Sequence, residues 1–122
     1  MIILDTDHFS ALKYGADGPG ARLRRRMAGS RDQFFAVTVI TLEEQMRGWL
    51  AEIVRFFNAW EIVAFDDAAA AHSAVLRKSR LRTGTMDLKI ASIALAQDAL
   101  LLTANTQDFA RVAGLRFENW LD

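Results

Sequence analysis

The chain has 122 residues, 52% hydrophobic and 25% charged, which suits one globular domain over residues 1–122 and excludes a disordered chain. Its 15 basic and 15 acidic side chains give a net charge of zero, so bulk charge does not indicate a nucleic-acid partner. Without cysteine, a basic leader or an apolar run near the ~20 residues of a membrane helix, we expect a cytoplasmic protein with no disulfide, signal peptide or membrane span.

The first half of the chain alternates short apolar runs with helical patterns. Ile2–Leu4 is predicted to be a strand and Thr6–Lys13 a short helix, followed by a second helix over Ala21–Ala28. The aromatic and β-branched run Phe34–Thr38 predicts a second strand, and Thr41–Ile53 a third helix.

The same alternation continues in the second half. Ile62–Phe65 is predicted to be a strand, and Asp66-Asp67 to cap a helix that runs to about Arg82. Thr85 is expected to cap an apolar, buried helix over Met86–Ala99. A strand over Leu100–Thr103, a helix over Thr106–Val112 and an edge strand over Leu115–Phe117 complete the series. Strands that alternate with helices indicate an α/β fold with a mostly parallel sheet of four or five strands.

Two interpretations stay open for the stretch from Trp49 to Trp60, because no turn residue interrupts it before Asn58. Either one long helix passes through it, or a loop is missing from the sequence at about Ile53-Val54. The second fits better, since a helix packed on a small sheet usually turns back sooner.

Acidic residues stand where predicted strands end and helices begin. In a parallel sheet these positions share one edge, at which functional residues collect. The four acids are Asp5, Glu44, Asp87 and Asp108, and Asp7 is a further candidate. Mg²⁺ and Mn²⁺ prefer such oxygen ligands, and can hold a phosphodiester and activate a bound water.

Each acid also has a purely structural interpretation. Thr41 to Glu44 fits a capping box, Asn105 to Asp108 could be a similar helix start, and Asp87 favours the helix dipole. Against this, Asp87 opens an otherwise apolar helix, and Thr103 and Asn105 add polar groups beside Asp108 that a cap does not need. Spacing alone leaves both interpretations open.

Four segments together resemble PIN-domain ribonuclease toxins of the VapC type. The opening Met1-Ile2-Ile3-Leu4-Asp5-Thr6-Asp7 is similar to their first motif. Thr41-Leu42-Glu43-Glu44-Gln45-Met46-Arg47-Gly48 resembles the second, in which an acid stands four residues before a glycine, a spacing that selects Glu44 over Glu43. Gly84-Thr85-Met86-Asp87 and Leu102-Thr103-Ala104-Asn105-Thr106-Gln107-Asp108 resemble the third and fourth, and the end of the chain is also similar. The segment between Trp49 and Phe57 departs from the family in being shorter.

This resemblance implies a three-layer α/β/α sandwich and an Mg²⁺- or Mn²⁺-dependent endoribonuclease. It carries over Asp5, Glu44, Asp87 and Asp108 as catalytic residues, with Thr103 and Asn105 in support. The implied partners are an RNA substrate and a small antitoxin that blocks the site. A cluster of aromatic residues suggests a homodimer or an antitoxin groove, with core packing as the default: Trp49, Phe56, Phe57 and Trp60.

In our mechanistic hypothesis, one or two cations are held by Asp5, Asp87 and Asp108, directly or through water. Glu44 helps to position an attacking water. In-line attack would leave a 5′-phosphate and a 3′-hydroxyl. His8 and His72 are expected to be incidental to this chemistry, and His72 to lie at the surface.

Two basic runs could contact RNA phosphates. The first is Arg22, Arg24, Arg25, Arg26 and Arg31, and the second is Arg77, Lys78, Arg80 and Arg82. A solvated helix face or a partner's acids explain the first run equally well. The second leads into Gly84 and Asp87, so Arg80 and Arg82 are the better RNA-binding candidates.

Two rival functions remain. Leu4-Asp5-Thr6-Asp7 also has the Asp-x-Asp start of a haloacid-dehalogenase-like phosphatase, in which Asp5 would be the nucleophile and Asp7 the acid/base. Two features argue against the phosphatase. Phe9 stands where that family has a small β-branched residue, and the paired acids that the family carries later in the chain are missing. The other rival is a non-catalytic protein-binding module of the same fold, against which the presence of all four acids argues.

Overall fold

A five-stranded, all-parallel sheet organises the chain in the computed structural model, which describes residues 1–14, 17–45, 60–81 and 83–122. Its strands, in the spatial order β3-β2-β1-β4-β5, are β1 (Ile2–Leu4), β2 (Phe35–Thr38), β3 (Glu61–Val63), β4 (Leu100–Leu102) and β5 (Arg116–Glu118). The described helices are α1 (Thr6–Tyr14), α2 (Pro19–Ala28), α3 (Val39–Gln45), α5 (Asp67–Lys78), α6 (Thr85–Ala96) and α7 (Thr106–Phe109).

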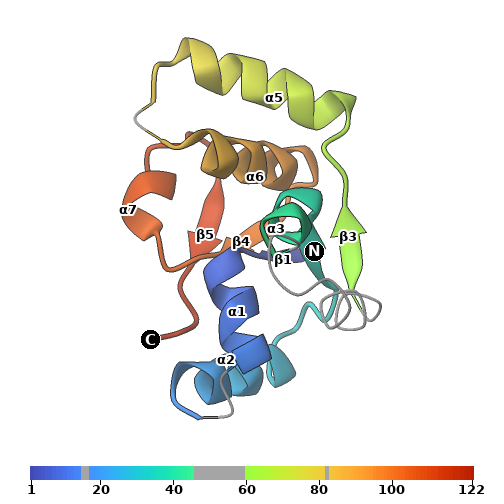
Figure 1. The fold of residues 1–122 in the computed structure, drawn as a ribbon, viewed down its shortest axis with the longest axis vertical. Coiled ribbons are helices and arrows are strands. Elements are labelled where there is room, and N and C mark those ends of the chain that lie inside the picture. The colour runs from blue at the N-terminus through green and yellow to red at the C-terminus, as the bar shows by residue number, and fades with distance from the viewer. Residues whose placement is uncertain (15–16, 46–59, 82) are drawn as a thin grey trace.

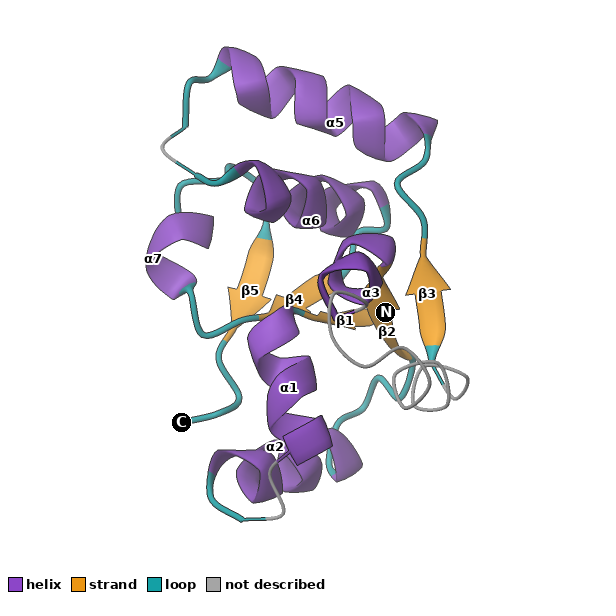
Figure 2. Cartoon of the chain, in the orientation of Figure 1, coloured by secondary structure: helices purple, strands orange, loops and turns teal. Residues whose placement is uncertain are grey.

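Apolar side chains cover both faces of the sheet, because successive residues of a strand point to opposite sides. Ile3 and Leu101 pack in a core with α5 and α6, whereas Leu4 and Leu102 pack in a second core with α1 and α2. The two helix pairs lie on opposite sides of the strands (Figure 1). The predicted α/β/α sandwich is therefore confirmed, and Figure 2 shows its three layers.

The helix pair α5 and α6 differs in detail from the prediction. Asp66 caps α5 as expected, accepting the Ala69 backbone N–H at 2.9 Å. The helix ends at Lys78 instead of near Arg82, because Arg80 turns the chain with a left-handed φ of 52°. The prediction that Thr85 caps α6 was wrong: the N-cap residue is Gly84, which has no side chain to cap the helix. The middle of α6 is buried, as predicted.

The helix α3 begins two residues before its predicted start. The Thr41 backbone N–H donates to the Thr38 hydroxyl at 3.2 Å, so Thr38 supplies the cap expected from Thr41. Near the end of the chain, α7 stops at Phe109, short of the predicted Val112. The predicted end of the third helix and most of the Trp49–Trp60 stretch lie outside the described residues. No described helix is long and apolar enough to cross a membrane.

Candidate active site

The order of the strands creates the place where the polar residues meet. From β1 the chain moves outward to β2 and β3, then returns to place β4 on the other side of β1. Such a reversal opens a crevice at the carboxyl ends of the two strands that flank it. Leu4 pairs with Leu102, and the Asp5 N–H donates to the Leu102 carbonyl at 2.8 Å. Asp5 and Thr103, the next residues of the two strands, are thereby neighbours.

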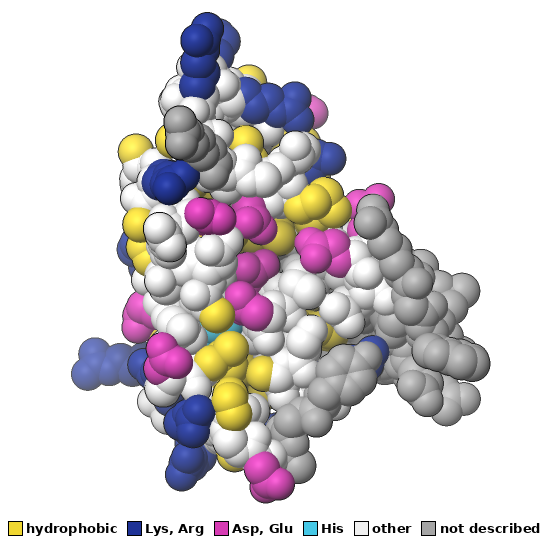
Figure 3. All heavy atoms as spheres, turned by 60° about the vertical axis from the view of Figure 1, so that its left-hand side comes forward, with side chains coloured by type: hydrophobic (Ala, Val, Ile, Leu, Met, Phe, Trp, Pro, Cys, Tyr) yellow, Lys and Arg dark blue, Asp and Glu magenta, His cyan; other side chains and the backbone are white. Residues whose placement is uncertain are grey.

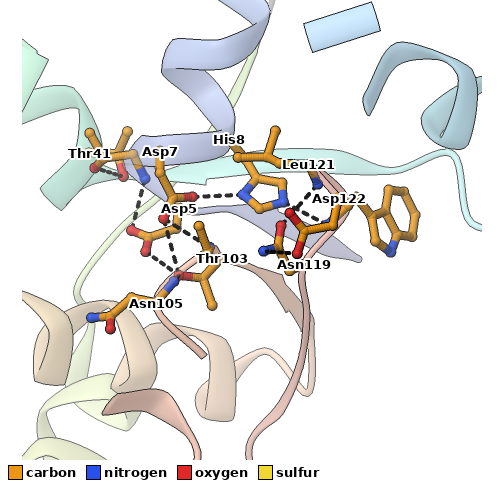
Figure 4. Close-up of polar contacts among 12 residues, drawn as sticks. Asp5, Asp7, His8, Thr41, Thr103, Asn105, Asn119, Leu121 and Asp122 are labelled. Carbon is orange, nitrogen blue, oxygen red and sulfur yellow. Dashed lines mark hydrogen bonds and ion pairs between the residues drawn. The ribbon is translucent and has the colours of Figure 1, made fainter. Parts of the chain in front are cut away.

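Asp5 is a buried carboxylate whose hydrogen bonds come from uncharged donors. Its residue surface is 6% exposed. The Thr103 hydroxyl donates to Oδ2 and the Thr6 N–H to Oδ1, both at 2.8 Å (Figure 4). Burial, and then the negative charge of Asp7, raise the pKa of Asp5 to about 7, because the two hydrogen bonds only partly offset them.

Asp7 joins the start of α1 to the loop that follows β4. One carboxylate oxygen lies 2.7 Å from Nδ1 of His8, and the other accepts the Ala104 N–H at 2.9 Å. Burial alone would raise the pKa of Asp7, but the bonds from His8 and Ala104 outweigh it and hold that pKa below the usual range. Asp7 is thus an ionised carboxylate beside Asp5. His8 is fully buried, so it is not incidental to the arrangement of this site.

Asp87 and Asp108 are brought together by one amide. The Asn105 side chain donates to Oδ2 of Asp87 at 3.2 Å and to Oδ2 of Asp108 at 3.1 Å. Both acids are half-buried. Burial, followed by the charge of Asp108, raises the pKa of Asp87, while the bond from Asn105 opposes the rise. The charge of Asp87 also acts on Asp5, so these acids form one electrostatic cluster.

Glu44 reaches the same edge from α3. Its Oε2 accepts the Thr6 hydroxyl at 3.4 Å, one residue beyond Asp5, and Thr6 also lies 3.3 Å from the Thr41 hydroxyl. Glu44 is half-buried and Glu43 is exposed, which agrees with the choice of Glu44.

The capping-box interpretation fails for Glu44 and Asp108, although Asp108 lies in the first turn of α7. Thr41 lies inside α3, so Thr41 and Glu44 form no capping box. Asn105 makes no side-chain cap on α7, because its amide is bonded to Asp87 and Asp108 instead. Asp87 does lie in the first turn of α6.

Three acids of this cluster have no lysine or arginine partner in the part of the chain that the structure describes. Within those residues, no lysine or arginine forms an ion pair with Asp5, Asp87 or Asp108. No pocket of the described chain encloses the cluster, and acidic side chains gather on one open face (Figure 3).

The donor set suits a hard divalent cation. All the candidate ligands are carboxylate oxygens, and burial, followed by their mutual repulsion, raises the pKa of Asp5 and Asp87. Within the described residues, no three acidic or histidine side chains are already arranged around a common metal position. Mg²⁺ commonly takes only one or two carboxylates and completes its shell with water and substrate phosphate. The residues therefore fit such an ion without forming a closed cage.

The first basic run is used largely within the chain. Arg22, Arg24 and Arg26 each donate to a backbone carbonyl, of Leu121, Leu12 and Asn119 respectively. Arg80 is exposed, and Arg82 lies outside the described residues. Lysine and arginine side chains border the acidic face in Figure 3.

Two smaller predictions can be compared with the structure. His72 is exposed, as predicted. Among the clustered aromatic residues, Trp60 packs edge-on against buried Phe9 with ring centroids 5.5 Å apart, whereas Trp49, Phe56 and Phe57 lie outside the described residues.

Sequence reasoning missed three contributors to the site. Thr6 and Thr41 link Glu44 to the end of β1, and His8 holds Asp7. For Thr6, the available signal is its place between Asp5 and Asp7, which makes three consecutive oxygen-bearing side chains. For His8, the available signal was its place in an apolar helix beside an acid, since a buried imidazole needs polar partners.

The curated proteins that match this chain are VapC endonucleases, the class that the four motifs resemble. No protein-family profile matches the chain. A segment of 75 residues, 58% of this chain, is 36% identical to the tRNA(fMet)-specific endonuclease VapC of Shigella flexneri, and the match spans 57% of that protein's length. The VapC of Salmonella typhimurium is 32% identical over a segment of the same length.

Solved structures extend the likeness to nearly the whole chain. VapBC2 of Rickettsia felis, solved with a DNA fragment from its promoter, superposes with a TM-score of 0.80 at 26% identity, covering 98% of this chain and 99% of that one. VapBC-1 of nontypeable Haemophilus influenzae gives 0.85 at 22% identity with full coverage of both chains (100% and 100%), and it shows the likeness of fold alone.

Proposed function

We propose that this chain is a VapC-type PIN-domain protein, a divalent-metal-dependent endoribonuclease and the toxin of a toxin–antitoxin pair. In this proposal, residues 1–122 form one catalytic domain that acts on RNA in the cytoplasm.

One observation carries the proposal: acids from separate elements meet at the switch point of the sheet with neutral donors between them. Thr103 orients Asp5, and Asn105 orients Asp87 and Asp108. Hydroxyl and amide groups fix a carboxylate without cancelling its charge. The cluster therefore keeps its affinity for a cation, and the cation would in turn attract a phosphate.

Asp5, Asp87 and Asp108 are the residues that would hold Mg²⁺ or Mn²⁺, directly or through water. When bound, such an ion supplies an activated water and stabilises the charge of the leaving oxygen. Glu44, aligned by Thr6, orients the attacking water. We give Asp7 a supporting role rather than that of a ligand, because its hydrogen bonds with His8 and Ala104 join α1 to the loop that follows β4.

RNA would be attracted by the second basic run. Arg80 is exposed on the turn between α5 and α6, before the helix that carries Asp87. We assign phosphate contacts to Arg80 and Arg82, which carry no sequence information themselves.

A small antitoxin and a second copy of the chain are the protein partners that we propose. The similar protein VapBC2 of Rickettsia felis is a VapBC pair by name, which supports an antitoxin for this chain. Phe34 and Ile62 are large apolar side chains that stay exposed, at 50% and 37%. Exposed apolar side chains favour a protein contact. Co-purification of a small protein that suppresses RNA cleavage would support the antitoxin, and a monomeric mass at micromolar concentration would contradict the homodimer.

The first test compares two substrates. Single-stranded RNA and a chromogenic phosphate monoester are each incubated with the protein, with Mg²⁺ or with EDTA. We expect Mg²⁺-dependent RNA cleavage that leaves 5′-phosphate ends, and no monoester hydrolysis. Hydrolysis of the monoester alone would favour the phosphatase. Neither activity, together with no stabilisation by Mn²⁺, would favour the binding module.

The structure already argues against the phosphatase. Its acid/base would be Asp7, but hydrogen bonds hold the pKa of Asp7 below the usual range, and an acid catalyst needs a raised one.

A second test uses a matched pair of variants in α3. Glu44→Gln should reduce cleavage strongly, because removing one catalytic carboxylate commonly costs about 100-fold or more. Glu43→Gln, on the exposed side of the same turn, should cleave like the wild type. Equal activity of both variants would remove Glu44 from the site. Asp87→Asn should abolish cleavage without unfolding the protein.

A further inference from the structure

His8 is a fully buried imidazole with two hydrogen-bond partners. Its Nδ1 lies 2.7 Å from Oδ1 of Asp7, and the Trp120 backbone N–H lies 3.0 Å from its Nε2. A backbone N–H can only donate, so Nε2 must be the acceptor and carry no proton. The proton of the neutral ring is therefore on Nδ1 and is donated to Asp7.

The donated proton fixes the orientation of Asp7. With Oδ1 occupied by His8, Oδ2 accepts the Ala104 N–H at 2.9 Å and lies 3.4 Å from the Thr103 hydroxyl. Ala104 stands between Thr103 and Asn105, the residues that orient Asp5, Asp87 and Asp108. Asp7 is thus the connection between α1 and the loop that arranges the acids.

The other partner of His8 is itself held in place. Residues 119–122 run beside α2, where Arg22 donates to the Leu121 carbonyl at 2.9 Å and Arg26 donates to the Asn119 carbonyl at 3.2 Å. The Arg26 guanidinium also lies 5.4 Å from the ring centroid of Trp120. The acceptor end of His8 therefore meets a fixed donor, which selects one tautomer (Figure 4).

We propose that His8 is a positioning residue, which uses the Trp120 N–H to keep its proton on Nδ1 and thereby holds Asp7 and the 103–105 loop in the arrangement that the acids require. A residue that merely filled space in the core would need its shape alone. A positioning residue needs its donor to Asp7.

Two substitutions separate the two ends of the ring. In His8→Asn, the amide nitrogen takes the place of Nδ1 and can donate to Asp7, but nothing reaches Trp120. In His8→Gln, the longer side chain can accept from Trp120 at the place of Nε2 and leaves Asp7 without its donor. Both replace a buried ring with an amide, so their effects on stability should be similar.

The activity test rests on the proposed ribonuclease function. Loss of a residue that orients a site carboxylate commonly costs 10- to 100-fold, so we expect His8→Ala to lower kcat by about that factor with little change in KM. The kcat of His8→Asn should be at least about tenfold higher than that of His8→Ala. The kcat of His8→Gln should stay as low as that of His8→Ala. Equal activity of the Asn and Gln variants would overturn the positioning role.

The proposed function and this inference can fail separately. If the wild type neither cleaves RNA nor binds Mn²⁺, the ribonuclease assignment fails. Nitrogen NMR of the ring tests the inference without any activity and without variants that must fold. We expect the wild-type protein to show a protonated Nδ1 and an unprotonated Nε2 at His8. Observation of the other tautomer would overturn the inference whether or not the protein is a nuclease.

Discussion

Replacing Asp5 by Asn should stabilise the metal-free protein at alkaline pH. The pKa of Asp5 in the folded chain is about 7, against 3.8 for an ordinary aspartate, so the unfolded chain loses this proton more readily. Below pH 3.8 the carboxyl is protonated in both the folded and the unfolded chain, so it does not change the free energy of unfolding. As the pH rises from about 4 to 7, unfolding is increasingly favoured, by about 1.4 kcal/mol per pH unit.

The magnitude follows from the difference between the two pKa values. About three units correspond to an upper limit of roughly 4 kcal/mol at pH 8. Asparagine removes this cost, but its side chain has only one acceptor oxygen, so one of the donors Thr6 and Thr103 loses its hydrogen-bond acceptor. This loss lowers the free energy of unfolding by about 1–2 kcal/mol. We therefore expect Asp5→Asn to be about 2 kcal/mol more stable than wild type at pH 8 in EDTA, and to have no advantage at pH 4.

Urea unfolding followed by tryptophan fluorescence at both pH values measures this difference. Asp17→Asn is the matched control, because Asp17 is exposed and the same charge is removed there. Its stability relative to wild type should hardly depend on pH. Added Mg²⁺ should stabilise the wild type at pH 8 and should do so much less in Asp5→Asn. A difference between Asp5→Asn and wild type that stays constant from pH 4 to 8 would refute the reasoning.

Three further substitutions test other parts of the site. Asn105→Ala removes the amide shared by the two acids, so Mn²⁺ titration should show at least about tenfold weaker binding, with the urea midpoint nearly unchanged. Thr103→Val deletes a buried hydroxyl and should cost about 1–3 kcal/mol in the unfolding free energy, whereas Thr103→Ser should recover most of it; equal losses would deny the hydroxyl its role. Arg80→Gly should raise the unfolding free energy by about 1 kcal/mol, because it relieves a left-handed residue, while the salt dependence of RNA binding becomes weaker. Asp98→Gly, at a φ of 49°, should give the same stabilisation without any change in RNA binding, and an equal change in both would remove Arg80 from the RNA surface.

The layout of the fold was accessible from the sequence because its signals are local. Each predicted strand within the described residues is present, and β1 has the predicted bounds. The errors fall at helix ends. Thr38 caps α3 through its hydroxyl, whereas the capping-box interpretation of the sequence assigns this role to Thr41, three residues later. Two threonines with the same chemistry stand at both places, so only the direction of the chain after β2 decides between them.

The composition of the site was predicted less completely than its location. The switch point follows from the order β2-β1-β4, which brings Asp5 next to Thr103, although they are 98 residues apart in sequence. No local pattern indicates that the Asn105 amide turns away from α7 to reach Asp87. The same holds for His8, whose donor in residue 120 is distant in the chain. Long-range hydrogen bonds of this kind depend on the packing of the sheet and cannot be read from spacing.

The choice of neutral donors explains how the site can be both ordered and charged. An arginine beside Asp5 or Asp87 would lower the pKa of that carboxyl and keep it ionised, but it would also occupy the charge that a cation needs. The described structure uses the Thr103 hydroxyl and the Asn105 amide there, and confines Arg22 and Arg26 to the carbonyls of the tail. Order at the acids is supplied instead through Asp7, whose charge stays in the site and adds to burial in raising the pKa of Asp5. The described fold therefore retains unbalanced charge at the one edge where a cation and a phosphate would meet it.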